Sequence, residues 1–497
     1  MAGAGVRARP APVKKRDERG PSHRLWRKGA DSQREFVMIP KFRAALLLAA
    51  TVLWVTGAIA APTGADAVPA LVAAFDAERK ALGVAGLALS LEDNVAALKE
   101  GAALAAEKDF AARHLARLAP IDAGALPLCA RIDLEKARFD ASMQLRRASL
   151  AGRDGFRERL AAGLGVSADG RDFYDLLLDW QIGEDVDPEK IFAFGERQVR
   201  RANRRYAALQ KQIGFAGDDA GLLEHLKSGA FGAADAAFLQ QRFEAADASV
   251  REKLGALFLD YAVPPVKIAR AERGGPLAQT PGFYDGASGT FYYNAPGETY
   301  DLRNRDWLYL HEALPGHHFQ TAIGALAGAC ATALPDLWSP AFVEGWGAYV
   351  ETLGRRLGLY ETPEAELAAV EWDMVRSARV VIDVGMNYRG WSDAEALVYW
   401  RKAVRGQENI AQREIDRMRR WPAQVVTYKY GAVRFEEARD RLAKQAGAAF
   451  DERVFHDLVL GRGPMPFAVF ASLVENTPAA TGSPGPAAPA NRGPIPE

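Results

Sequence analysis

Helical periodicity along most of the chain is the feature that most constrains its fold. From Val68 to about Tyr261, the residues Ala, Leu, Glu, Arg and Lys dominate, and apolar side chains recur three and four positions apart. Phe173, Leu176, Leu177 and Trp180 form one such stripe. This pattern predicts an N-terminal helical region over residues 68–261.

One β-rich patch interrupts the helical pattern between residues 262 and 300. Val266–Arg270 and Gly289–Asn294 are predicted strands, separated by turns rich in Gly and Pro. Helical periodicity resumes at Asp301 and continues to about Leu473. With 49% hydrophobic and 25% charged residues, the chain has the composition of a globular protein with a large core. We therefore predict a mainly α fold with one small sheet or hairpin, which opens a second region over residues 262–475.

The first 61 residues have the pattern of an export leader. Residues 1–37 are basic and polar, so we interpret them as a disordered extension that is not translated if synthesis begins at Met38. Residues 38–61 then form a signal peptide: a short basic start, the apolar run Ala44–Ala61 and the cleavage site Ala58-Ile59-Ala60. We expect a periplasmic or secreted protein with no membrane span after cleavage. The alternative is an uncleaved anchor, because about 18 apolar residues approach the length of a bilayer span.

Charge and cysteine content exclude some partners and leave other questions open. Lys plus Arg equals Asp plus Glu at 63 each, so no net field attracts nucleic acid, and we predict no nucleic-acid binding. Cys129 and Cys330 either pair or remain as two buried thiols. Residues 476–497, rich in Pro, Ala and Gly, are a predicted disordered tail. The oligomeric state stays open.

Three of the seven histidines lie within eight residues, from His311 to His318. His311 is followed directly by Glu312, and further carboxylates occur downstream at Glu344 and Glu351. Two imidazoles and one carboxylate as ligands, with a second carboxylate as base, are what a hydrolytic zinc site needs. The segment therefore predicts a site for one Zn²⁺ ion.

The spacing of these histidines requires an irregular helix. A zinc-hydrolase helix carries His at positions i and i+4, but here i+4 is Pro315. On a regular helix His317 points about 120° away from His311, and His318 lies about 10 Å further along the axis. A bulge at Pro315 and Gly316 would return His317 to the i+4 place. We expect His311 and His317 as ligands and His318 beside the site or at the substrate. Alternatively, Pro315-Gly316 simply ends the helix, and the histidines cap it or lie at the surface.

The third ligand is expected from a predicted helix over residues 341–357. One carboxylate completes a site with two His and one Glu and leaves a coordination position for water. We assign Glu344 to the metal. Glu351, two turns further on, either orients a ligand imidazole or is a solvated carboxylate.

The chain resembles a large bacterial family, domain-of-unknown-function family 885, regarded as zinc metallopeptidases related to the gluzincins. Two motifs carry the resemblance, His-Glu-x-x-Pro-Gly-His-x-x-Gln at His311–Gln320 and Glu-Gly-Trp-x-x-Tyr-x-Glu at Glu344–Glu351, and both match at every fixed position. The likeness spans about residues 70–475. It continues through Arg379–Gly385, Gly390-Trp391, Trp421–Gln424, Tyr428–Gly431 and Phe455–Asp457.

The resemblance implies a mainly helical, gluzincin-like fold with its small sheet beside the active-site helix. It also implies Zn²⁺ on His311, His317 and Glu344, with Glu312 as general base. The chain departs from the family at two places. Asn387 stands where the family tends to carry His, and Ala423 replaces the Gly of a Pro-Gly-Gln turn.

The expected reaction is hydrolysis of a peptide or small amide. Glu312 would take the proton of the attacking water, and an oxyanion donor would assist. Tyr428 is the first candidate for that donor, although core packing is the more common role of such a tyrosine; Asn387 and His318 follow. Gln320 is grouped with His318 and Glu351 as supporting or substrate-contacting residues.

Three further expectations concern the substrate and the alternatives. The strand at Gly289–Asn294 could pair with an extended peptide. A second enzymatic interpretation is a zinc amidase or esterase with a non-peptide substrate. A third is a secreted binding protein with a vestigial metal site, for which Asn387 is the best argument.

Overall fold

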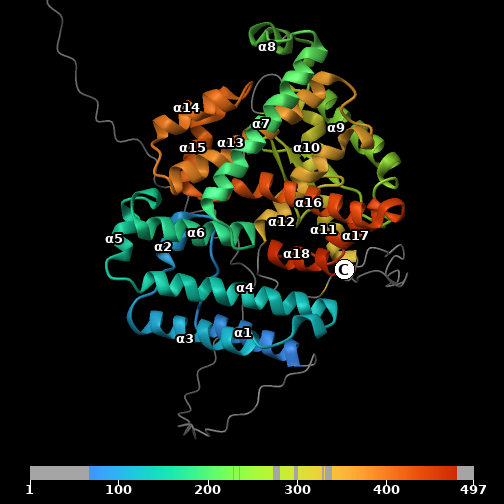
Figure 1. The fold of residues 1–497 in the computed structure, drawn as a ribbon. Coiled ribbons are helices and arrows are strands. Elements are labelled where there is room, and N and C mark those ends of the chain that lie inside the picture. Colours follow the sequence, from blue (N-terminus) through green and yellow to red (C-terminus); the bar gives the residue numbers. More distant parts are fainter. Residues whose placement is uncertain are drawn as a thin grey trace, which may run out of the picture. The chain divides into compact units, whose positions relative to one another are not determined.

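A computed structural model describes residues 67–227, 229–233, 235–272, 280–295, 300–326, 330 and 339–477 (Figure 1). The predicted extension, the signal peptide and residues 478–497 of the predicted tail lie outside the described residues. Within the described ranges, no helix combines the length and the apolar composition that a membrane span requires.

The predicted N-terminal helical region is mainly helical, and polar side chains cap several of its helices. Ser167 accepts a hydrogen bond from the backbone N–H of Gly170, and Asp187 caps a helix that begins with Pro188. The helices are α1 (Val68–Ala81), α2 (Leu91–Ala96), α3 (Gly101–Leu118), α4 (Leu128–Ala151), α5 (Phe156–Ala161), α6 (Ala168–Ile182), α7 (Pro188–Ile213), α8 (Asp219–Lys227) and α9 (Ala236–Leu254).

The second region is also mainly helical, so the predicted fold class is confirmed. The segment predicted as one helix over residues 341–357 is α-helical only to Val350 and continues as a 3-10 helix over Glu351–Leu357. The helices are α10 (Asn304–Glu312), α11 (His317–Leu326), α12 (Pro340–Val350), α13 (Pro363–Asn387), α14 (Asp393–Ala403), α15 (Ala411–Arg420), α16 (Val426–Ala446), α17 (Glu452–Leu460) and α18 (Phe467–Glu475).

The β-rich patch forms more sheet than predicted. The two predicted strands are present as β2 (Lys267–Arg270) and β4 (Thr290–Tyr293), and β3 (Gly282–Asp285) joins them in the order β2-β4-β3. The strand β3 runs antiparallel to β4, with Phe283 opposite Tyr292, and β2 runs parallel to β4. A second, two-stranded sheet pairs β1 (Gly232–Ala233) with β5 (Tyr300–Asp301). The prediction of a single sheet is therefore wrong.

The position of β4 also corrects the expected mode of peptide binding. Because β4 lies between β2 and β3, both of its edges are already hydrogen-bonded. It cannot accept an extended peptide as a further strand. The sequence pattern missed β3 because four residues next to Pro281 carry too little alternation to mark a strand.

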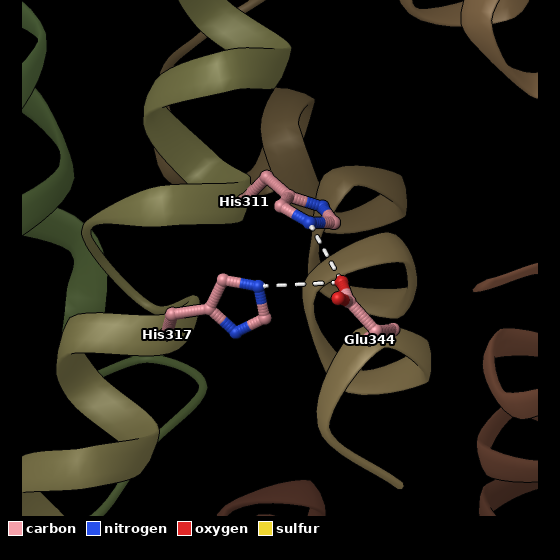
Figure 2. A group of neighbouring side chains, drawn as sticks. All are labelled: His311, His317 and Glu344. Atoms are coloured by element: carbon pink, nitrogen blue, oxygen red, sulfur yellow. Dashed lines mark ion pairs between the residues drawn. The ribbon is translucent and has the colours of Figure 1, made fainter. Parts of the chain in front are cut away.

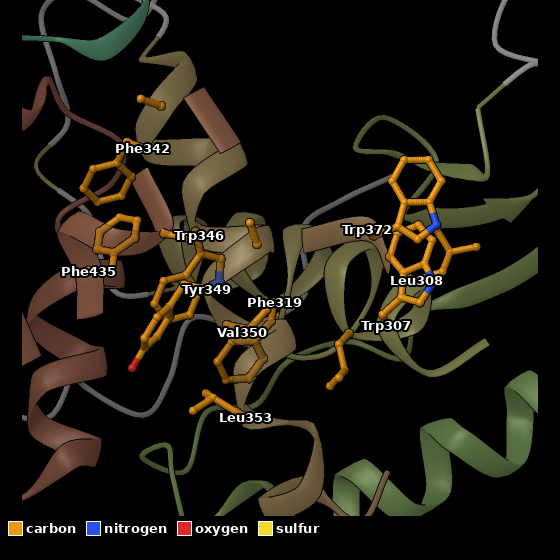
Figure 3. Packing of buried hydrophobic residues seen from close by; sticks show 14 of the residues in the cluster. Trp307, Leu308, Phe319, Phe342, Trp346, Tyr349, Val350, Leu353, Trp372 and Phe435 are labelled. Atoms are coloured by element: carbon orange, nitrogen blue, oxygen red, sulfur yellow. The ribbon is translucent and has the colours of Figure 1, made fainter. Parts of the chain in front are cut away.

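Close helix packing places α12, the helix that carries Glu344, in the core. The helix α12 packs along α16, and α13 packs along α7 (Figure 1). At the first crossing, a Cβ atom on Gly345 would lie 2.5 Å from the Cα atom of Gly431, so only glycine permits this approach. Trp346 and Phe342 of α12 pack edge-to-face on Phe435 of α16 (Figure 3). The residue before Gly345, Glu344, is held in place by this packing.

A disulfide joins the two helical regions. Cys129 at the start of α4 is bonded to Cys330, 201 residues later, with their Cα atoms 5.0 Å apart. Of the two alternatives left open by the sequence, the structure therefore has the paired cysteines.

Candidate metal centre

The chain between the first two histidines is not a bulge within one helix, as predicted, but a break between two helices. The helix α10 ends at Glu312, and α11 begins at His317. Pro315 has no N–H to donate. A Cβ atom on Gly316 would lie 1.9 Å from the carbonyl oxygen of His311, so the chain turns back tightly against the end of α10. The alternative in which the break leaves the histidines at the surface is also wrong, because His311 is buried and its ring centroid lies 4.8 Å from that of His317.

His311, His317 and Glu344 converge on one point (Figure 2). The two imidazoles come from the adjoining ends of α10 and α11, and the carboxylate comes from α12. The Nε2 atoms of His311 and His317 each lie 3.7 Å from Oε2 of Glu344. Each residue offers one donor atom, and the three atoms lie within 4.8 Å of one another.

The donor set fits a zinc ion. Ligand atoms at about 2.1 Å from a tetrahedral centre lie about 3.4 Å apart. The observed distance of 3.7 Å between each Nε2 and Oε2 of Glu344 is too long for a hydrogen bond but close to this ligand-to-ligand separation. Two imidazole nitrogens and one carboxylate oxygen are typical zinc ligands, and three protein ligands leave a fourth position open. His317 and Glu344 retain 14% and 20% exposure of their side chains, so solvent reaches this side of the site.

A glycine on α12 makes room for the first imidazole. A Cβ atom on Gly347 would lie 2.6 Å from Cε1 and 2.9 Å from Nε2 of His311. The ring therefore occupies the space that any larger residue would fill. Gly347 stands three residues after Glu344, so the same helix supplies the carboxylate and receives the ring.

Glu351 orients this imidazole from the other side. Its Oε1 lies 2.8 Å from Nδ1 of His311, and Nη1 of Arg376 lies 2.5 Å from its Oε2. Because a carboxylate only accepts, Nδ1 of His311 carries the proton and Nε2 is turned toward Glu344. Glu351 is buried, so the alternative of a solvated carboxylate is wrong.

The charges at the site favour a bound cation. Burial lowers the pKa of His311, but the neighbouring carboxylates of Glu344 and Glu351 outweigh this effect and raise the pKa to about 9. Burial alone would raise the pKa of Glu344, yet the two imidazoles hold it well below its usual range. The carboxylates thus stabilise positive charge at the site. In the absence of a metal ion, protons on the imidazoles provide that charge.

Glu312 ends α10 beside the first ligand. Its side chain is buried, and no hydrogen bond to its carboxylate occurs within the described part of the chain. The carboxylate is therefore not committed to a structural partner. Its charge adds to those that raise the pKa of His311, which places it within electrostatic reach of the ring.

Comparison with known proteins identifies the family. A model described as "Bacterial protein of unknown function (DUF885)" matches residues 70–474. The chain belongs to this family. No curated protein matches it.

Two solved structures share the fold. The chain is similar to a "putative lipoprotein" from Colwellia psychrerythraea, with 19% identity, a TM-score of 0.58, and coverage of 80% of this chain and 78% of that chain. It is also similar to a "putative lipoprotein of unknown function" from Shewanella oneidensis, with 14% identity, a TM-score of 0.61, and coverage of 84% of this chain and 100% of that chain. At these identities the likeness concerns the fold alone.

In this DUF885 protein, Tyr428 lies against the metal centre. Its ring is nearly parallel to that of His311, with centroids 6.1 Å apart. Its hydroxyl oxygen accepts from Nη2 of Arg417 at 3.2 Å and from Nε2 of Gln424 at 3.5 Å. Burial and the nearby charge of Glu344 raise the pKa of Tyr428, so the phenol keeps its proton. In the described ranges no acceptor takes that proton, which leaves it available to donate.

Asn387 does not join this group. Its Nδ2 atom donates to the carbonyl oxygen of Met418 at 3.2 Å, and its side chain lies near the buried carboxyl group of Asp383. That carboxyl in turn accepts from Tyr174 and the backbone of Ala423. The expected role of Asn387 as an oxyanion donor stays a prediction, and the hydrogen bond to Met418 occupies part of the amide that this role would need.

His318 and Gln320 face other surroundings. The His318 ring lies between Pro264 and Tyr284: Nε2 is 2.8 Å from the carbonyl oxygen of the first, and Nδ1 is 3.1 Å from the hydroxyl of the second. Both of its nitrogens are thus engaged by protein atoms. Gln320 is buried in α11, and its Nε2 has no partner within the described residues.

Sequence reasoning missed Arg376 and Arg417. Arg376 stands among apolar residues of α13, and such an arginine normally has a buried acidic partner, here Glu351. An arginine among apolar helical residues was therefore the sequence feature that could have identified Arg376. Arg417 stands in a helix of mostly charged residues, where nothing in the sequence distinguishes it.

Proposed function

We propose that this protein is a zinc-dependent hydrolase of the gluzincin kind that cleaves peptide bonds. The observation that carries the proposal is the convergence of two Nε2 atoms on one carboxylate, with Glu312 adjacent. His311 and His317 each lie 3.7 Å from Glu344, as ligands of one ion would. A buried carboxylate without a structural partner, following the first ligand, is what a general base requires.

The residues of the chain have distinct roles in this proposal. A zinc ion on the three ligands would act as a Lewis acid that activates water and polarises a carbonyl group. The Glu312 carboxylate accepts the proton of the attacking water and passes it to the leaving nitrogen. The Tyr428 hydroxyl donates a hydrogen bond to the carbonyl oxygen as negative charge develops there, an effect typically worth about 3 kcal/mol. Glu351 keeps His311 in the tautomer that leaves Nε2 unprotonated.

We infer that the enzyme acts outside the cytoplasm. The disulfide between Cys129 and Cys330 is typical of an oxidising compartment. The leader pattern at residues 38–61 supports the same location. The substrates would then be peptides of the periplasm or the surroundings of the cell.

The second candidate is a secreted binding protein with a vestigial metal site. That interpretation depends on Asn387, whose Nδ2 donates to the carbonyl oxygen of Met418. The replacement of His at this position therefore leaves the donor set and Glu312 intact.

The test separates zinc binding from turnover. The Glu312→Gln variant should keep its zinc, measured by elemental analysis, and lose hydrolysis of a mixed peptide library about 10²- to 10⁴-fold. Glu361→Gln, which changes an exposed glutamate, is the matched control. The same assay with a chelator, and with simple amides and esters, shows which bond is cleaved. Unchanged turnover by Glu312→Gln would remove this residue from the mechanism, and a wild-type protein that cleaves only esters or simple amides would replace the peptidase assignment.

A further inference from the structure

A cluster of arginines adjoins the metal centre and contains more positive than negative charge. Arg379 of α13 and Arg413 of α15 both pair with Glu414: the Nη2 of Arg379 lies 2.6 Å from Oε2, and the Nη2 of Arg413 lies 2.9 Å from Oε1. Both oxygens of this carboxylate are therefore engaged. A second carboxylate beside these arginines, Glu351, is engaged by Arg376 and His311.

Arg417, one turn after Glu414 on α15, forms no ion pair with a carboxylate among the residues that the structure describes. Its Nη2 donates to Oε1 of Gln424 at 2.7 Å and to the Tyr428 hydroxyl at 3.2 Å, and both acceptors are neutral. In the described part of the chain, no carboxylate oxygen lies within 4 Å of its guanidinium. Its Nε is buried and lacks a hydrogen-bond partner among the described residues. This half-buried guanidinium has lost part of its hydration, and the carboxylates of Glu414 and Glu344 act on it only from beyond 4 Å.

The position of Arg417 relates it directly to the proposed chemistry. Tyr428 lies between Arg417 and the metal centre: its hydroxyl accepts from Arg417, and its ring stacks on His311. The carbon at the centre of the Arg417 guanidinium is 5.8 Å from the centroid of the Tyr428 ring. A substrate whose carbonyl oxygen meets the Tyr428 hydroxyl would therefore have a neighbouring group within reach of Arg417.

We propose that Arg417 forms a carboxylate-binding subsite beside the metal centre, so that the preferred substrates are peptides with a carboxylate close to the cleaved bond. A guanidinium binds a carboxylate through two parallel N–H donors, and Nε of Arg417 is one unused donor of such a pair. The carboxylate is either the C-terminal carboxylate of the peptide or the side chain of an Asp or Glu residue. This inference rests on the proposed function for the identity of the substrate, but binding can be measured without turnover.

The experiment measures the affinity of three peptides for zinc-loaded Glu312→Gln protein by calorimetry, so that no peptide is consumed. The peptides are acetyl-Ala-Ala-Ala with a free carboxylate, its C-terminal amide, and acetyl-Ala-Glu-Ala-amide. Each is also titrated against protein that carries Arg417→Gln or Arg417→Lys in addition. Arg420→Gln, which changes an exposed arginine on the same helix, is the control.

The free carboxylate or the glutamate peptide should bind at least about 10-fold more tightly than the neutral amide, because the charge-assisted pair is lost in the amide. Arg417→Gln should abolish this preference, Arg417→Lys should retain part of it, and Arg420→Gln should leave it unchanged. Whichever acidic peptide shows the preference identifies the source of the carboxylate.

Two results would overturn the subsite. One is equal affinity for all three peptides. The other is an equal loss of affinity for every peptide in the Arg417→Gln variant, with thermal unfolding unchanged. That result would mean that Arg417 only supports Tyr428. Failure of the hydrolase proposal appears separately, as absent turnover by the wild-type protein, and leaves these binding differences measurable.

Discussion

Nδ1 of His311 donates to Oε1 of Glu351 across 2.8 Å, and this contact joins the two motifs of the chain. It fixes the ring so that Nε2 is directed at Glu344, one of the three clustered residues. Arg376 holds the other oxygen of Glu351, so the carboxylate cannot rotate away. A ligand oriented in this way loses less conformational freedom when it binds an ion.

Replacing Glu351 should weaken zinc binding without removing a ligand. In Glu351→Gln the charge-assisted bond to His311 is lost, and the zinc affinity should fall about 10- to 100-fold. Competition with a chromophoric chelator measures this change. Glu361→Gln, an exposed substitution, should leave the affinity as it is. Equal affinities for wild type and Glu351→Gln would show that the contact does not serve the metal.

Gly347→Ala should displace the first ligand. The added Cβ atom would lie 2.6 Å from Cε1 of His311, and the ring has to move to relieve the contact. We expect more than a tenfold loss of zinc affinity by the same competition assay. Gly324→Ala in α11 is the matched control, because a Cβ atom there has no neighbour within 4 Å. That control should raise the free energy of unfolding by about 0.5–1 kcal/mol, and normal zinc binding by Gly347→Ala would contradict the assigned packing.

The stability of the protein should depend on pH through Asp383. Burial raises the pKa of this carboxyl to about 7, although Tyr174 and the backbone of Ala423 oppose the shift. The unfolded value is near 3.8. Since the unfolded chain releases the proton first, this contribution to stability is complete below pH 3.8 and is lost as the pH rises to about 7. The slope is at most about 1.4 kcal/mol per pH unit.

The Asp383→Asn variant tests this dependence. Asn keeps an acceptor for the hydroxyl of Tyr174 and does not titrate, so its free energy of unfolding should lose this slope between pH 4 and pH 7. Urea denaturation of both proteins across this range provides the comparison. Parallel profiles would mean that Asp383 ionises in the folded protein at its ordinary pKa.

Removing the disulfide should lower stability substantially. The bond between Cys129 and Cys330 closes a loop of 201 residues, and its loss in the Cys129→Ala/Cys330→Ala variant should cost about 2–5 kcal/mol. Urea denaturation of the variant and of oxidised wild type gives the difference. An unchanged midpoint would show that the bond does not constrain the unfolded chain.

The parts of the site that could be predicted are those whose residues lie close together in the sequence. The grouping of His311, His317 and Glu344 followed from short spacings and familiar zinc chemistry, and the structure brings these residues together. The break between α10 and α11 was expected only as a bulge. The difference arises from the close approach of Gly316 to the carbonyl oxygen of His311, a backbone contact that no residue pattern encodes.

Other features depended on contacts between segments far apart in sequence. The predicted helical regions and two strands are present, but β3 and the pairing of β1 with β5 needed tertiary partners that local patterns do not show. The hydrogen bond from Asn387 to the backbone of Met418 could not be predicted either, because the two residues lie in different helices. The unpaired charge of Arg417 was equally hidden, because 63 Arg and Lys residues offered no way to select one.

The central claim is that one zinc ion binds to His311, His317 and Glu344. Crystals of the zinc-loaded protein, measured on both sides of the zinc absorption edge, test it most directly. The account predicts one anomalous peak at about 2.1 Å from Nε2 of both histidines and from a carboxylate oxygen of Glu344. A zinc peak bound elsewhere on the chain, or no peak at these three residues in zinc-loaded crystals, would contradict it.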